Sequence, residues 1–227
     1  EERRGAVAEG AEQERHLGGR RAGDGPDDVE LGCPGGRDLV GEEDGVAALR
    51  WISPHSPSTD EEMARQGFRR VRLLHQMRRP LPLEDEVRRG TREIRVRPMR
   101  PDHPGDVEGF LRVNNRAFDW HPEQGGWDEE RLAATMAEDW FDPAGFLLHE
   151  GDDGAIDGFC WTKVHPPGHT WPDDPPLGEI FVIAVDPSTH GTGLGRALTV
   201  AGLDHLASRS LTTAMLYVEA DNEPAVA

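Results

Sequence analysis

The sequence has only two cysteines, a single lysine and no long apolar run. Cys33 and Cys160 are too few and too far apart to build a disulfide framework or a metal-binding knuckle. Because no apolar run reaches about 18 residues, a membrane-spanning helix is excluded. Basic residues are outnumbered by acidic ones, and the net charge of -18 argues against a general binder of nucleic acid or anionic membranes. We therefore expect a reduced, cytoplasmic, monomeric protein that binds neither nucleic acid nor membrane and captures anionic ligands locally.

Composition divides the chain into three parts. Residues 1–50 are rich in Gly, Asp, Glu and Arg and lack a periodic apolar pattern. We expect them to be disordered or poorly packed, because such a stretch buries too little apolar area to offset its chain entropy. In residues 51–90, a short helix over 61–66 is predicted to end at Gly67, a strand follows over 68–77, and prolines then open a linker. The pattern of a folded domain begins at Thr91.

Residues 91–227 show strand and helix patterns in succession. Helices are predicted over 104–118, 128–140 and 194–208, and strands over 93–97, 145–150, 156–165, 177–185 and 214–219. Asp128 is the predicted N-cap of the second helix, whose buried stripe is Leu132, Ala133, Met136, Ala137 and Trp140. The 177–185 strand is almost wholly apolar, which is typical of a strand covered on both faces. A helix connects it to 214–219, so these two strands should be parallel. A last helix is predicted to begin at Asp221 or Asn222, and the whole pattern predicts an α/β (α+β) fold with a mixed central sheet flanked by helices.

A glycine-rich loop lies between the 177–185 strand and the 194–208 helix. Gly191, Gly193 and Gly195 permit positive φ angles and close backbone approach, so that successive N–H groups can converge on an anion. The start of the helix adds its dipole and its unpaired N–H groups. Arg196 could add a charge-assisted contact. This arrangement can hold a diphosphate even on an acidic protein.

The loop does not match two other phosphate-binding patterns. The dinucleotide pattern G-x-G-x-x-G is not met, because the last gap between Gly193 and Gly195 is too short. No lysine follows the glycines, which excludes the Walker pattern. A tight turn without a ligand remains open from the residues alone.

Longer strings carry a family resemblance. The loop is similar to the pyrophosphate motif of the GNAT acetyltransferases, Gln/Arg-x-x-Gly-x-Gly/Ala, with Gly193 and Gly195 in its glycine positions and His190 as a departure at the first. Beyond the loop, the chain resembles the mycothiol synthase family over about 91–227, in the strings FLRVNNRAF (110–118), HPEQGGW (121–127), WFDPAGF (140–146), WTKVH (161–165) and MLYVEADN (215–222).

The resemblance implies an activity and a domain plan. The family transfers acetyl from acetyl-CoA to the amine of cysteinyl-glucosaminyl-inositol, a small thiol-amine, and yields mycothiol. It has two GNAT domains in tandem, so that 51–90 would be the end of the first plus a linker, and 91–227 the C-terminal domain without its last helix and closing strands. In the family, the leaving thiolate receives its proton from a tyrosine of that last helix, beyond Ala227. Weak acetyl-CoA binding and poor turnover are therefore expected of this chain.

The same resemblance assigns Glu123, Lys163, Glu179 and Tyr217 to the acceptor, with Glu179 as the catalytic base. The residues alone leave alternatives open. Glu123 lies beside two glycines, as in a mobile clasp, but could equally be a solvated loop acid. Lys163 could be a strand-end side chain that reaches solvent.

The strands predicted over 156–165 and 177–185 determine on which face of the sheet Lys163 and Glu179 lie. Lys163 is predicted to share a face with Phe159 and Trp161, where an ammonium group needs a polar ligand or an exit to solvent. Alternation places Glu179 with Phe181 and Ile183, and partial burial there suits a general base. A solvated strand-end carboxylate is the alternative.

Acetyl-CoA is the expected cosubstrate, and no metal is expected. Backbone N–H groups late in the 177–185 strand are predicted to bind the pantetheine arm and the thioester oxygen where the two parallel strands splay. The positions assigned to acetyl-CoA are Ile183, Ala184, Val185, His190, Gly191, Thr192, Gly193, Leu194, Gly195, Arg196 and Asn222.

Three other polar or reactive residues are interpreted as structural. Cys160 lies among apolar strand residues, and His205 lies on the apolar stripe of its helix. Asn114 is predicted to be a satisfied buried amide. Two other functions stay open: acetylation of a different amine, such as a peptide N-terminus, and an inactive fragment that binds CoA.

Overall fold

A computed structural model describes residues 3–11, 36–43, 46–54, 56–120, 124–169, 171–220 and 222, with backbone alone for 3–54 and 69–72. The chain divides into two compact units. The first comprises Glu1–Arg78, Gly168–Asp174 and Tyr217–Ala227, and the second comprises Arg79–Pro167 and Pro175–Leu216.

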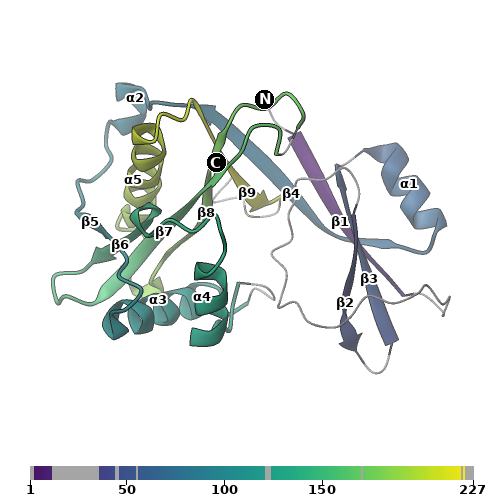
Figure 1. Cartoon of the computed structure of the whole chain (residues 1–227), viewed down its shortest axis with the longest axis horizontal. Coiled ribbons are helices and arrows are strands. Elements are labelled where there is room, and N and C mark those ends of the chain that lie inside the picture. Colours follow the sequence, from purple (N-terminus) through teal and green to yellow (C-terminus); the bar gives the residue numbers. More distant parts are fainter. Residues whose placement is uncertain are drawn as a thin grey trace. The chain divides into compact units, whose positions relative to one another are not determined.

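In its described part, the first unit contains a set of antiparallel strands and a helix (Figure 1). The strands lie in the order β2-β3-β1-β4 and are β1 (Arg3–Ala11), β2 (Gly36–Glu43), β3 (Val46–Pro54) and β4 (Arg69–Pro80), the last of which ends in the second unit. Strands β1 to β3 fall where the sequence shows no periodic apolar pattern, and the packing of residues 1–50 stays a prediction.

Helix α1 (Pro57–Arg65) has clear signals at both ends. The Ser56 side chain accepts a hydrogen bond from Thr59 N–H at 3.1 Å, as an N-cap does. At the other end Gly67 has a φ of +90°, a conformation that glycine adopts without steric cost. The helix predicted over 61–66 is thus confirmed as the second half of α1, and the strand that follows it is confirmed as β4.

The second unit is built on a mixed sheet in the order β9-β8-β7-β6-β5 (Figure 1). Its strands are β5 (Val96–Pro98), β6 (Phe146–Glu150), β7 (Ile156–His165), β8 (Leu177–Val185) and the first part of β9 (Thr213–Glu219). Neighbouring strands from β5 to β8 are antiparallel, whereas β8 and β9 are parallel. The predicted mixed sheet is confirmed.

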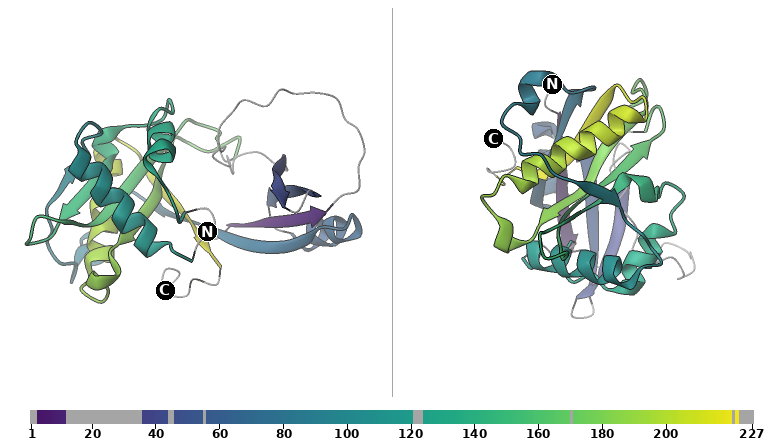
Figure 2. Two further views of the ribbon diagram at one scale, coloured as in Figure 1. Left: turned by 90° about the horizontal axis from the view of Figure 1, so that it is seen from below. Right: turned by 90° about the vertical axis from the view of Figure 1, so that its left-hand side faces the viewer.

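Helices cover both faces of this sheet (Figure 2). Helices α3 (Pro104–Ala117) and α4 (Glu129–Met136) lie against one face, and α5 (Leu194–Ser208) lies against the other. The short helix α2 (Asp85–Arg88) and two single turns, η1 (Pro143–Gly145) and η2 (Pro187–Thr189), complete the elements. Inside the predicted linker, Leu81 and Leu83 are buried in the core beneath α5.

The α4 prediction was too long. The helix begins after its predicted cap Asp128, which accepts from Arg131 N–H at 2.8 Å, but it ends at Met136, and Ala133 and Ala137 are exposed. Two acidic residues, Glu138 and Asp139, follow at once, and negative charge at a helix C-terminus is unfavourable.

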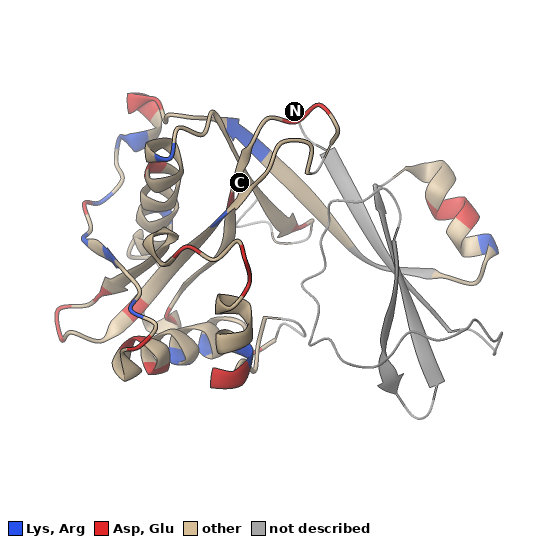
Figure 3. Cartoon of the chain, in the orientation of Figure 1, with Lys and Arg blue, Asp and Glu red and all other residues tan. Residues whose placement is uncertain are grey.

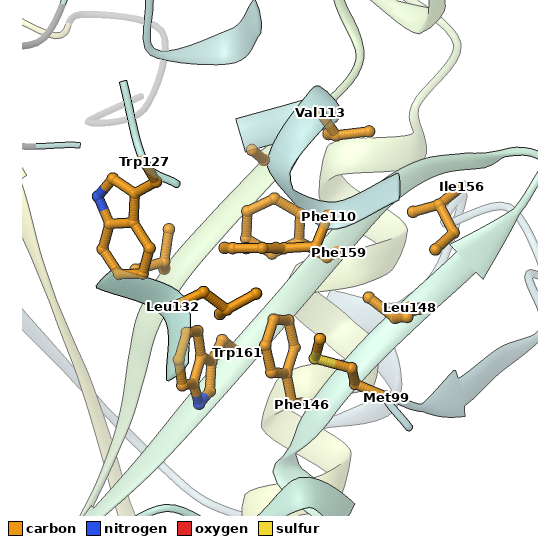
Figure 4. Close-up of a cluster of buried hydrophobic side chains, with 12 residues drawn as sticks. Met99, Phe110, Val113, Trp127, Leu132, Phe146, Leu148, Ile156, Phe159 and Trp161 are labelled. Atoms are coloured by element: carbon orange, nitrogen blue, oxygen red, sulfur yellow. The ribbon is translucent and has the colours of Figure 1, made fainter. Parts of the chain in front are cut away.

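The core between α3, α4 and the sheet is aromatic (Figure 4). Phe110 of α3 is fully buried and meets Phe159 edge-on with ring centroids 4.7 Å apart. Trp161 stacks on Phe146 at 4.2 Å. The buried members of this core cluster are Met99, Phe110, Val113, Trp127, Leu132, Phe146, Leu148, Ile156, Phe159, Trp161, Val182 and Ala184. This cluster fixes the side of the sheet on which the candidate site is built.

The opposite core depends on close approach of α5 to the sheet. A Cβ at Gly202 would overlap Cys160 Sγ and lie 2.7 Å from Ile180 Cδ1. Cys160 is fully buried there, and burial raises the pKa of its thiol to about 12. It is therefore a packed core residue, as predicted, rather than a nucleophile.

Basic and acidic side chains are interspersed over the described elements (Figure 3). Of the helices in the described part of the chain, none is long and apolar enough to cross a bilayer.

Candidate active site

Strand β8 carries a β-bulge in the middle of the sheet. Trp161 of β7 is paired with Val182, and the next residue, Thr162, is paired with Ile180, so that Phe181 is the extra residue. Because of this bulge, the predicted alternation of side chains along the strand is wrong beyond Phe181. Phe181 packs with the aromatic core, whereas Ile183 packs on the α5 side, because the extra residue shifts the facing of everything after it. Glu179 and Ile183 therefore do not share a face.

Glu179 lies just before this bulge and is paired with a histidine. Its Oε2 is 2.6 Å from Nε2 of His165, and the two residues are 7% and 4% exposed. A carboxylate can only accept, so the histidine donates whenever Glu179 is ionised. The sequence alone assigns no role to His165, although this residue lies in the WTKVH string. Its position two residues after Lys163, on the same strand face, is the signal that could have identified it.

Lys163 is directly opposite Glu179 in the β7–β8 register. Its Nζ lies 4.3 Å from the centroid of the Trp140 ring and 5.5 Å from that of Phe181. These aromatic faces attract a cation and offset part of its lost hydration. The half-buried ammonium group is thus held on the aromatic side of the sheet, beside the predicted base. The structure brings Lys163 and Glu179 together.

Parallel pairing of β8 with β9 is recorded at Gly178–Ala214 and Glu179–Met215. Ile183, Ala184 and Val185 lie beyond those two pairs and are matched with β7 on the other side. In an antiparallel pair only every second residue directs its N–H to the neighbouring strand. Among Ile183, Ala184 and Val185, the N–H groups that do not point to β7 therefore point to the side of β8 on which β9 lies.

The loop before α5 has the conformation that its glycines allow. Gly191 and Gly193 have φ angles of +77° and +79°. Gly193 is the N-cap of α5 and contributes no side chain, so the first-turn N–H groups are not capped from within the helix start. In the described part of the chain, no acceptor is recorded for the N–H groups of Gly191, Gly193, Leu194, Gly195 or Arg196. Several donors are thus available at one helix N-terminus.

Asp186 organises the turn that leads into this loop. Its carboxylate accepts from Ser188 N–H at 3.0 Å and from Ser188 Oγ at 2.6 Å, and it pairs with Arg116 at 2.8 Å. Burial alone would raise the pKa of Asp186, but the Ser188 hydrogen bonds and the Arg116 charge outweigh it, and the pKa lies below its ordinary value. Asp186 is therefore an anchor for the loop.

Arginines flank the loop differently from the prediction. The Arg196 guanidinium donates to Thr91 Oγ1 at 3.1 Å and to Val87 O at 3.0 Å, so its side chain fastens the α2–β5 segment. Arg92 was not predicted. Its Cδ lies 4.0 Å from where a Cβ of Gly193 would be, and its side chain is exposed. No sequence pattern marks this residue.

The sequence pattern of the acetyltransferase (GNAT) family matches residues 113–227. A mycothiol acetyltransferase from Acidimicrobium ferrooxidans is 51% identical over 78% of this chain and 55% of its own length. One from Segniliparus rotundus is 44% identical over 82% of this chain and 69% of its own length. The chain belongs to the GNAT family, among the mycothiol acetyltransferases. The predicted resemblance is confirmed, and the chain spans little more than half the length of the first of these relatives.

The fold is confirmed independently. A GCN5-related N-acetyltransferase from Sphaerobacter thermophilus superimposes with a TM-score of 0.55 at 24% identity, over 74% of this chain and 49% of its own. At that identity the likeness concerns the fold alone.

The roles of the other predicted site residues of this GNAT chain stay predictions. Tyr217 and Asn222 belong to the first unit, where the Tyr217 hydroxyl accepts from Gln76 Nε2 at 2.6 Å and Asn222 N–H donates to Glu219 O at 3.0 Å. Glu123 lies outside the described residues. His190 is exposed, and its N–H donates to Pro187 O at 3.3 Å.

The segment after Glu123 is tied to α3 by two asparagines. Asn114 is fully buried and donates to Gln124 O at 2.7 Å, but its Oδ1 accepts no hydrogen bond from the described residues, so the predicted satisfied amide is only half satisfied. Asn115 donates to Trp127 O at 2.7 Å and accepts from Trp127 N–H at 2.8 Å. The HPEQGGW string of this GNAT domain therefore ends in a fixed position.

His205 is partly buried in α5. Burial lowers the pKa of His205, which keeps its imidazole neutral over a wider pH range. Among the side chains that the structure describes, no group of three His, Cys, Asp or Glu is placed to hold a metal.

Proposed function

We propose that this protein transfers the acetyl group of acetyl-CoA to the cysteinyl amine of cysteinyl-glucosaminyl-inositol. One observation carries the proposal: in a chain that belongs among the mycothiol acetyltransferases, a buried carboxylate and a lysine are cross-strand neighbours just before a bulge in the central strand. The cytoplasmic location, the monomeric state and the limits of the domains, 51–90 and 91–227, remain predictions.

The loop of residues 190–196 would hold the diphosphate. Its free N–H groups at the α5 start supply donors and a positive dipole end without a net positive field, which suits a protein of charge -18. The glycines let the diphosphate approach the backbone closely. Backbone N–H groups of Ile183, Ala184 and Val185 would receive the pantetheine arm and the thioester oxygen, where negative charge develops.

On the acceptor side, side chains would bind and deprotonate the amine. Glu179 takes a proton from the cysteinyl ammonium, directly or through one water, and frees the nitrogen lone pair. The nitrogen bonds to the acetyl carbon as the carbon–sulfur bond breaks. The nitrogen then loses its second proton, and the thiolate of CoA takes up one proton, so that a neutral amide and a thiol result. Lys163, with its ammonium group on the Trp140 ring, and the clasp residue Glu123 would bind polar groups of the acceptor. Tyr217 stays a predicted acceptor contact, and Asn222 stays a predicted contact of acetyl-CoA.

The test is acetyl transfer by the purified chain. Acetyl-CoA is supplied with cysteinyl-glucosaminyl-inositol, and the N-acetyl product and released CoA thiol are both quantified. Glu179→Gln should lower kcat by roughly 10²- to 10⁴-fold because the base is lost. Glu108→Gln, an exposed carboxylate on α3, is the matched control and should behave as wild type.

The acceptor is tested by competition between substrates. A peptide with a free N-terminus is offered under the same conditions, and preference for it would replace the proposed acceptor with another amine. CoA binding without transfer to either amine would reject the enzymatic proposal.

A further inference from the structure

The buried partner of Glu179 is a histidine to which the family resemblance assigns no role. Nε2 of His165 lies 2.6 Å from Glu179 Oε2, and both side chains are almost wholly buried. The two residues are diagonal neighbours in the β7–β8 register, in which His165 is opposite Leu177 and Glu179 is opposite Lys163. Sheet geometry, rather than a flexible loop, sets their distance.

Glu179 is hydrogen-bonded to His165, whereas the Lys163 ammonium group lies over aromatic rings. Lys163 is the direct cross-strand neighbour of Glu179, yet its Nζ lies over the Trp140 and Phe181 rings. Among the described residues, the Glu179 side chain has one hydrogen bond, which Oε2 accepts from His165 Nε2. One carboxylate oxygen is thus fixed by a histidine, while Oε1 has no recorded protein partner.

We propose that His165 is a positioning residue that acts through Glu179. By donating from Nε2 to Oε2, it holds the carboxylate in one rotamer and leaves Oε1 for the incoming amine or its water. A base that is held in place loses less orientational freedom in the transition state, which raises kcat rather than substrate affinity. This inference rests on the proposed function, because it assigns a role within the same site.

Two amide variants separate positioning from mere packing. Glutamine places an N–H close to where the histidine Nε2 lies, whereas asparagine places it near Nδ1, too far from Glu179. His165→Gln should retain kcat within about fivefold, and His165→Asn should lose about 10- to 100-fold with KM for acetyl-CoA nearly unchanged. Equal losses in the two variants, with equal melting temperatures, would overturn the proposal.

A double-mutant cycle tests whether His165 acts through Glu179. His165→Asn combined with Glu179→Gln should be no slower than Glu179→Gln alone, since the histidine then has no base to orient. Losses that multiply would show that His165 acts independently and would reject the inference.

A spectroscopic readout keeps the inference separate from the proposed function. The ¹⁵N signals of the His165 ring, identified among ten histidines by their loss in His165→Asn, should report a protonated Nε2 that shifts in Glu179→Gln but not in Glu108→Gln. An unchanged His165 signal in Glu179→Gln rejects the pairing, even if acetyl transfer is observed. A shifted signal in a protein that transfers no acetyl group supports the pairing and rejects the function.

Discussion

The two sides of the candidate site are built by different means. The proposed acceptor side depends on side chains brought together by strand register: Glu179 and His165 are buried, and Lys163 rests on aromatic rings. The proposed cosubstrate side depends on backbone N–H groups of an exposed loop whose conformation is local. Side-chain substitutions should therefore affect the amine and the chemistry, and backbone substitutions should affect acetyl-CoA affinity.

Lys163→Met gives the largest expected separation of the two sides. The variant keeps the stem that packs on Trp140 but removes the ammonium group. We expect kcat/KM for the acceptor amine to fall roughly 10- to 100-fold, as for loss of a hydrogen bond to a charged group, with acetyl-CoA affinity unchanged. Steady-state kinetics and calorimetry measure the two quantities. A matching fall in acetyl-CoA affinity would break the division, and Lys163→Arg tests whether charge alone suffices.

Gly193→Ala tests the cosubstrate side by changing the backbone of the loop. At a φ of +79° an alanine is strained, and the first N–H groups of α5 should lose their convergence. Acetyl-CoA affinity should fall about tenfold, while the amine KM at saturating acetyl-CoA stays the same.

Gly154→Ala controls for strain alone. Gly154 has a φ of +78° in the turn between β6 and β7, and a Cβ there would meet nothing within 4 Å. Both alanine variants should lose similar stability, but only Gly193→Ala should weaken acetyl-CoA binding. Equal affinities in the two variants would remove the loop from the cosubstrate site.

The same contrast explains what could be predicted from sequence. The loop of residues 190–195 was found because its signals are local: glycines at positive φ, a preceding apolar strand and a helix start. Strand β8 and helix α5 have the predicted limits for the same reason. Lys163 and Glu179 came from the family resemblance, because periodicity alone left a solvated strand end open for each.

What could not be predicted depends on tertiary register. The Glu179–His165 contact requires the pairing of β7 with β8, and a proline-rich loop between them does not fix that register. The bulge at Phe181 turns Ile183 to the other face, which simple alternation cannot anticipate. The hydrogen bonds of the Arg196 side chain to Thr91 and Val87 likewise depend on tertiary packing, and its contact with the anion stays a prediction.

Asp186→Asn should give the smallest effect and sharpen the comparison through pH. The pKa of Asp186 is lowered in the folded state, so its contribution to stability is complete above the ordinary carboxyl pKa of about 4 and is lost as pH falls below it. The melting-temperature difference between wild type and Asp186→Asn should therefore be constant from pH 7 to 5 and shrink toward pH 3. Acetyl-CoA affinity at pH 7 should weaken only about threefold, because the variant loosens the turn at Ser188 without removing any N–H donor of the loop. If affinity instead collapsed while amine kinetics also changed, the loop and the acceptor side would form one coupled unit, and the division drawn between them would be wrong.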